Sequence, residues 1–111
     1  VPRVLIDNNA SATHTVIEVN GRDRPGLLYR LTSVLSDLKL QISSAKISTF
    51  GQRAVDAFYV KDQFGLKIEA EPRLKAIRSQ LLGALDRAEA AATGGAAADS
   101  PREAPAATAA Q

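Results

Sequence analysis

The chain has 111 residues, of which 45% are apolar, and its 14 basic and 12 acidic side chains give a formal charge of +2. This length predicts one domain with one modest core, and the interleaving of both charge signs argues against a phosphate-binding surface. The sequence begins with Val1 and contains neither methionine nor cysteine. We therefore expect a piece of a longer protein, without disulfides, thiolate metal sites or cysteine nucleophiles.

No apolar run approaches the roughly 20 residues that a membrane-spanning helix needs, and no segment resembles a signal peptide. We expect a cytoplasmic chain with no membrane partner and no nucleic-acid partner. From residue 90 onward the sequence is rich in alanine and has paired glycines, two prolines and no large apolar side chain. Such a segment cannot offset its ordering entropy, so we expect residues 1–89 to form the folded domain and 90–111 a disordered tail.

The first half of the folded part predicts a hairpin followed by a helix. Two β-rich runs, at residues 3–7 and 13–20, are separated by small and polar residues that are compatible with a turn. Leucines then repeat at helical spacing behind Pro25, a residue that the first turn of a helix tolerates. We predict an amphipathic helix over residues 25–38.

The second half repeats this pattern. Two alternating segments, residues 41–49 and 53–62, flank a short connection that contains Gly51 and predict a second hairpin. Leucine and isoleucine then recur every three to four positions behind Pro72. This spacing predicts a second helix over residues 72–90.

The predicted order of elements is strand, strand, helix, strand, strand, helix. It is typical of an α+β fold in which a four-stranded antiparallel sheet carries both helices on one face. In the ferredoxin-like order a strand follows the second helix, but here no strand signal follows it. Residues 3–7 can occupy the slot of that missing strand, so we predict a ferredoxin-like fold that is circularly permuted to ββαββα.

One predicted loop carries chemistry that a simple connection does not need. The stretch VNGRDRPGLLYRL, residues 19–31, joins a central strand to the first helix, where unpaired backbone N–H groups and the helix dipole favour an anion. Gly26 lets a ligand approach the backbone, and Asp23 can cap the helix or accept a bond from an ammonium group. Asp, Pro and Gly are also common helix-start residues, and the spacing alone favours this simple capping role.

The segment GRDRPGLLYRLTSVLSDLKLQI resembles the signature region of ACT domains, small regulatory modules that bind amino acids in metabolic enzymes. The resemblance covers residues 13 to about 87 and departs from the ACT pattern at Gly21, where some relatives place histidine. The signature segment and the ending AFYVKDQFGLKI together resemble one group of ACT domains more specifically. This group is the C-terminal ACT domain of the bacterial bifunctional uridylyltransferase/uridylyl-removing enzymes, which modify the nitrogen-signalling PII protein. It implies a non-catalytic fragment of a nucleotidyltransferase that also has uridylyl-removing hydrolase activity.

The resemblance also implies an amino-acid sensor, with glutamine as the expected ligand, whose site spans the interface with a second ACT module or a homodimer partner. Asp23 is expected to contact the polar end of the ligand, while Gly26, Leu27 and Leu28 offer backbone N–H groups. Gln41 matches a strand start from which a neighbouring module often contributes an amide, although it is equally a polar residue at a strand edge. The expected ligand-binding residues are Asn20, Asp23, Arg24, Pro25, Gly26, Leu27, Leu28, Gln41 and Ile42.

Catalytic chemistry is not expected within these residues. His14 is the only histidine, and without cysteine a tetrahedral zinc site lacks ligands. Asp56 and Asp62 share a face of one predicted strand but are too far apart for a carboxylate pair, so both are expected to be solvated. Ser43 and Ser44 have no positioned base and third group with which to form a triad. We expect no catalytic residue, metal or cofactor.

Two alternative functions remain open on the sequence. RAVDAFYV superficially resembles an RNA-binding signature, but Phe58 and Tyr59 are adjacent and point to opposite faces, so at most one can stack on a base. A module that pairs through the strand edge QISSAKIST without any ligand is the other alternative. Only ligand-gated pairing would respond to an added amino acid.

Overall fold

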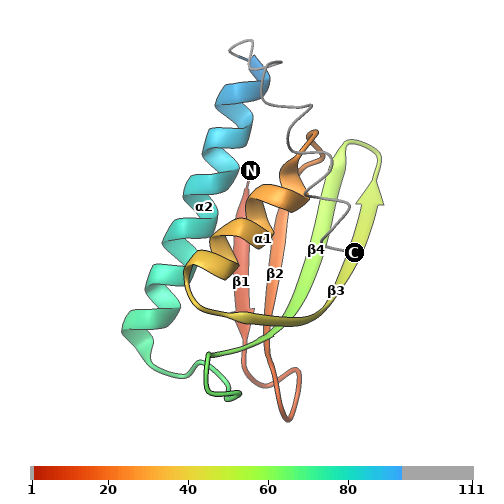
Figure 1. The fold of residues 1–111 in the computed structure, drawn as a ribbon. Helices are drawn as coiled ribbons and strands as arrows, with labels where there is room; N and C mark the ends of the chain where they lie inside the picture. Colours follow the sequence, from red (N-terminus) through yellow and green to blue (C-terminus); the bar gives the residue numbers. More distant parts are fainter. Residues whose placement is uncertain (1, 94–111) are drawn as a thin grey trace.

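The structure is a computed structural model that describes residues 2–93. Its elements are β1 (Arg3–Asp7), β2 (Thr15–Arg22), α1 (Leu27–Asp37), β3 (Gln41–Phe50), β4 (Arg53–Lys61) and α2 (Glu71–Thr93). The four strands form one antiparallel sheet in the order β1-β2-β4-β3, and both helices lie on the same face of it (Figure 1). The predicted α+β, ferredoxin-like ββαββα architecture is confirmed.

The circular permutation is visible in the position of β1. This strand pairs with β2 at one edge of the sheet, with Arg3 opposite Asn20 and Asp7 opposite Val16. That edge is the slot that the last strand occupies in the unpermuted order, so a hairpin from β1 into β2 replaces a return from α2. The opposite edge is β3, which pairs with β4 on one side only.

The core lies between the sheet and the two helices. Alternate side chains of β2 and β4 point to this layer, and the helices contribute the leucine and isoleucine stripes that predicted them. Several of these side chains are fully buried: Ile17, Val19, Leu31, Leu35, Phe58, Val60, Ile77 and Leu81. In contrast, nearly every residue of β3 is exposed, because this strand lies outside the area that the helices cover (Figure 1).

Two helix boundaries differ from the prediction by more than one residue. Helix α1 begins at Leu27 and not at Pro25, because Gly26 precedes it with a left-handed φ of 78° that no helical residue adopts. Helix α2 continues to Thr93, three residues past its predicted end, through alanines that have the highest helix propensity. The remainder of the predicted tail, 94–111, lies outside the described residues.

The start of β2 also differs, since the strand begins at Thr15 and not at residue 13. The backbone N–H groups of Thr13 and His14 donate to the Ser11 hydroxyl, at 3.2 and 3.1 Å. This local side-chain to backbone bonding competes with the sheet ladder and holds the preceding residues in a turn. At its other end β2 runs two residues beyond the predicted position, to Arg22.

No helix within residues 2–93 combines the length and the apolar character that crossing a membrane requires.

Candidate functional site

The connection between β2 and α1 is held by backbone hydrogen bonds and one special glycine. Asp23 N–H donates to Gln52 O at 2.8 Å, which fixes the connection against the turn between β3 and β4. Leu27 N–H donates to Arg24 O at 3.1 Å, and Gly26 adopts its left-handed conformation between them. A side chain at position 26 would strain this backbone, so the glycine is required by the turn itself.

A cavity of about 140 Å³ opens at this connection, beneath the start of α1. Its lining residues are Asp23, Arg24, Gly26, Leu27, Leu28, Ile47, Thr49, Ala54 and Asp56. Five of the nine residues predicted from the sequence are therefore brought together here. The volume equals roughly that of five water molecules, which suits a small polar molecule.

The other four predicted residues do not line this cavity. Asn20 lies on the sheet face opposite the helices, where its side-chain amide donates to the Glu18 carboxylate at 2.9 Å. Pro25 belongs to the connection but not to the cavity wall. Gln41 and Ile42 lie at the far end of β3, and the Gln41 amide donates to Asp62 O at 3.0 Å. Within one chain, Gln41 and Ile42 are separate from the connection between β2 and α1, which is called the ligand turn below because the ligand is predicted to bind there.

The first turn of α1 forms part of the cavity wall. Gly26 is the N-cap residue and makes no side-chain cap, so the capping role considered for Asp23 is not found. A helix supplies no acceptor for its first backbone N–H groups, and these groups carry the positive end of the helix dipole. Leu27 and Leu28 belong to this turn and line the cavity, but Leu27 N–H already donates to Arg24 O, so of the two only Leu28 is left for the predicted donor role.

The expectation that Asp56 is solvated is wrong. Its side chain is on the helix-facing side of β4, only 3% of the residue is exposed, and Oδ1 has no hydrogen-bond partner among the described residues. Burial, with a smaller contribution from the negative charge of Asp23, raises the pKa of Asp56 from 3.8 to about 6. This burial could not be predicted from the sequence, because apolar residues occupy both faces of β4 and the alternation does not reveal which face is buried.

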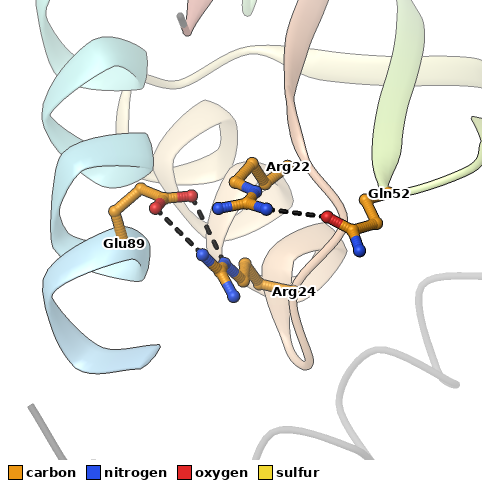
Figure 2. A network of polar contacts seen from close by, with 4 residues as sticks. All are labelled: Arg22, Arg24, Gln52 and Glu89. Carbon is orange, nitrogen blue, oxygen red and sulfur yellow. Dashed lines mark hydrogen bonds and ion pairs between the residues drawn. The ribbon is translucent and has the colours of Figure 1, made fainter. Parts of the chain in front are cut away.

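Two arginines beside the cavity are held by partners from other elements, as Figure 2 shows. Arg24 donates to both carboxylate oxygens of Glu89 on α2, with Nη2 to Oε1 at 3.0 Å and Nε to Oε2 at 3.3 Å. This hydrogen-bonded pairing raises the pKa of Arg24 and lowers the pKa of Glu89. Arg22 donates to the Gln52 side-chain oxygen at 2.7 Å. The ligand turn is thereby connected to α2 and to the β3–β4 turn.

A second, wider depression of about 450 Å³ lies near the β1–β2 turn and the loop after β4. Its lining residues are Ala12, Thr13, Lys61, Gly65, Leu66, Lys67 and Glu69, most of them exposed. It contains no residue of the predicted ligand turn. The smaller cavity at α1 is therefore the better candidate site.

The side chains considered for catalysis and for RNA binding lie in positions that suit neither function. His14 Nε2 lies 2.9 Å from Ser43 Oγ, but its Nδ1 contacts the Thr13 hydroxyl at 2.8 Å, where a triad has a carboxylate. Residues 2–93 contain no group of three or more potential metal ligands. Phe58 is fully buried while Tyr59 lies on the other face, so only one of the two aromatics can meet a base.

Comparison with protein families and known proteins places these residues among regulatory domains. The model of the ACR family N-terminal ACT domain matches residues 10–86. The bifunctional uridylyltransferase/uridylyl-removing enzyme of Azospirillum brasilense is 73% identical over 84 residues, which are 76% of this chain and 9% of that protein. The enzymes of the same name from Rhodospirillum rubrum and Gluconobacter oxydans are 60% and 62% identical, over 76% and 78% of this chain.

This chain spans 9% of the length of each of those three relatives. Among solved structures, an unknown protein from Galdieria sulphuraria superposes with a TM-score of 0.50 at 23% sequence identity. The match covers 63% of this chain and 37% of the algal one, and it supports the fold alone.

Proposed function

The chain belongs to the ACT domain family, whose model matches residues 10–86, and from that premise we propose that it is a regulatory module that senses an amino acid. We propose glutamine as the ligand. The module works without a cofactor, in the cytoplasm, and has no catalytic residue of its own. The cavity at the start of α1 carries this proposal, because it gathers the turn residues and the helix N-terminus around a space of small-molecule size.

The parent proposed for this module is a PII-modifying uridylyltransferase that also removes the uridylyl group. The support is the identity of 60 to 73% with three bifunctional enzymes over most of this chain. In such a parent the nucleotidyl transfer and the hydrolysis take place in other parts of the protein. The module controls them if glutamine has different affinities for two conformations of the parent.

The glutamine proposal is tested by titration calorimetry on the 111-residue chain. Glutamine is compared with glutamate, serine and a branched-chain amino acid, while light scattering records the oligomeric state. We expect saturable binding selective for glutamine, weakened at least tenfold by Asp23→Ala, which removes a charged hydrogen-bond acceptor from the cavity. Gly26→Val should weaken it similarly, since the turn requires a positive φ at that position.

Asp37→Ala is the matched control, because Asp37 is an exposed aspartate at the opposite end of the same helix. It should bind glutamine as the parent chain does, and circular dichroism should show all variants folded. Equal affinity in the parent, Asp23→Ala and Gly26→Val chains would contradict the proposed site.

A second candidate function, pairing without a ligand, is favoured by the exposure of β3. This edge strand is ten residues long, and its apolar side chains Ile42, Ile47 and Phe50 are 36%, 45% and 65% exposed. An uncovered strand of this length is a template for pairing with another strand. A dimer whose dissociation constant is the same with and without glutamine would favour this function over the sensor.

A further inference from the structure

Asp56 is the feature of the cavity that the ligand turn does not explain. It lies on β4 between the buried Ala54 and Phe58, is 3% exposed, and leaves Oδ1 without a partner among the described residues. Burying a carboxylate without a hydrogen-bond partner costs free energy, and buried polar atoms in folded proteins nearly always have one. Because Asp56 lines the cavity, a molecule inside the cavity can supply that partner.

The charges around the cavity favour a cation at this point. Asp23, Arg24 and Asp56 are the charged residues that line it. Arg24 is paired with Glu89 through two hydrogen bonds, so its positive charge is already compensated from α2 (Figure 2). Asp23 and Asp56 repel one another, which contributes to the raised pKa of Asp56. A cation placed between them relieves this repulsion and hydrogen-bonds the buried oxygen.

At the start of α1, by contrast, the cavity favours an anion. Leu27 N–H is bonded to Arg24 O, but the backbone N–H groups that follow it in the first turn of this eleven-residue helix favour an anion, and Gly26 provides no side-chain cap in its place. The cavity therefore offers an acceptor for a cation and donors for an anion within about 140 Å³. An α-amino acid carries these two charges on neighbouring groups.

We propose that Asp56 accepts the α-ammonium group of the ligand, so that the cavity selects zwitterionic amino acids over acids of the same shape that lack the amine. This assignment rests on the proposed sensor function and names the residue that defines its ligand class. Asp56 binds the ammonium group while the helix N-terminus binds the carboxylate. The side chain of the ligand then extends toward the exposed edge of β3, on the side of Ile47 and Thr49.

The test compares glutamine with glutaramic acid, which has the same carboxylate and amide but no amine. Calorimetry at pH 7.5 is run on the 111-residue parent chain, on Asp56→Asn and on the control Asp37→Asn. We expect the parent and the control to prefer glutamine at least tenfold, the ratio that a charge-assisted hydrogen bond provides. Asp56→Asn should bind both compounds within about twofold of one another.

A pH series adds a readout that a merely structural role would not produce. In the parent, glutamine affinity should fall as the pH decreases through about 6, because protonation of Asp56 removes the charge that holds the ammonium group. In Asp56→Asn this decrease should be absent. Circular dichroism confirms that the variant is folded before either comparison is made.

The outcomes separate this assignment from the sensor proposal. Asp56→Asn that keeps the tenfold preference for glutamine overturns the role of Asp56 and leaves the sensor intact. If the parent chain binds a different amino acid and Asp56→Asn loses that binding, glutamine is not the ligand but the role of Asp56 is supported. A parent that binds no amino acid overturns both.

Discussion

Asp56 is held where its charge is unfavourable, and this has a consequence for stability as well as for binding. Its pKa is about 6 in the folded chain against 3.8 for the free group, so between these values the folded state binds more protons than the unfolded state. The free energy of unfolding therefore decreases as the pH rises from about 4 to 6 and stays lower above that range. Such an unfavourable charge is typical of residues kept for function.

We predict that Asp56→Asn stabilises the chain at neutral pH. Folding raises the pKa of Asp56 by about two, which corresponds to at most about 3 kcal/mol in the free energy of unfolding. We therefore expect the free energy of unfolding of Asp56→Asn to exceed that of the parent by about 1–3 kcal/mol at pH 7.5. At pH 3.5 most of the gain should vanish, because Asp56 is then protonated in the folded state and largely protonated in the unfolded state. Urea unfolding of the parent and the variant at both pH values measures this, and a variant less stable than the parent at pH 7.5 would contradict it.

At the scale of single residues, the sequence predicts the connection between β2 and α1 well and the rest of the cavity wall poorly. Asp23, Gly26 and Leu27 are recognisable because a helix start has a local signature. Asp56 and Thr49 reach the same cavity from β4 and β3, and their contribution depends on strand register and on which face the helices cover. Neither is local in sequence, and the apolar alternation of β4 leaves its buried face undetermined.

Among the elements, α2 is directly coupled to the ligand turn. Glu89 lies near the end of this helix, 65 residues along the chain from Arg24, and holds its guanidinium by two hydrogen bonds (Figure 2). The side chains of Arg24 and Glu89 are 25% and 34% exposed, so salt screens the pair and its direct effect on stability is small. Its effect on the charge of the cavity is larger, since Arg24 lines it.

We therefore predict that Glu89→Gln weakens glutamine binding without unfolding the chain. The substitution leaves the positive charge of Arg24 uncompensated beside the site of the ammonium group, so the dissociation constant should rise about two- to fivefold. The effect should shrink at 1 M salt. Glu71→Gln, at the exposed start of the same helix, is the matched control and should bind as the parent does. If calorimetry shows no difference in glutamine affinity between these two variants, α2 does not influence binding at the cavity.

Element type and order follow from the helical spacing of apolar residues in α1 and α2 and from β-rich runs bounded by turn residues in the strands. Boundaries depend on local exceptions that these patterns do not contain. The left-handed Gly26 delays α1, the Ser11 hydroxyl delays β2, and alanine propensity prolongs α2. The permuted slot of β1 was predictable because the ferredoxin-like sheet leaves one edge position unfilled without it.

For the whole molecule, the contrast between the two sheet edges predicts how copies associate. β1 and β3 are both edge strands, but β1 lies beside α2 while β3 lies outside the cover of the helices (Figure 1). β3 also carries the longer exposed surface, which includes Ile42 and Phe50. We expect two chains to pair through β3.

A lysine on each edge tests this expectation. Ile42→Lys places a charge on β3 without touching the cavity and should raise the dimer dissociation constant at least fivefold. Leu5→Lys introduces the same charge at a 45% exposed site on β1 and should leave association unchanged. Sedimentation velocity distinguishes them, and equal effects of both lysines would assign pairing to another surface.

The circular permutation also brings the two ends of the described residues together. Arg3, at the start of β1, is opposite Asn20, and Glu89, near the end of α2, is bonded to Arg24, so both elements lie beside the β2–α1 connection. Pro2 and Glu89 even line the same small cavity. Two elements from opposite ends of the described residues thus meet at the β2–α1 connection, so a change in the position of that connection is expected to move β1 and α2 together.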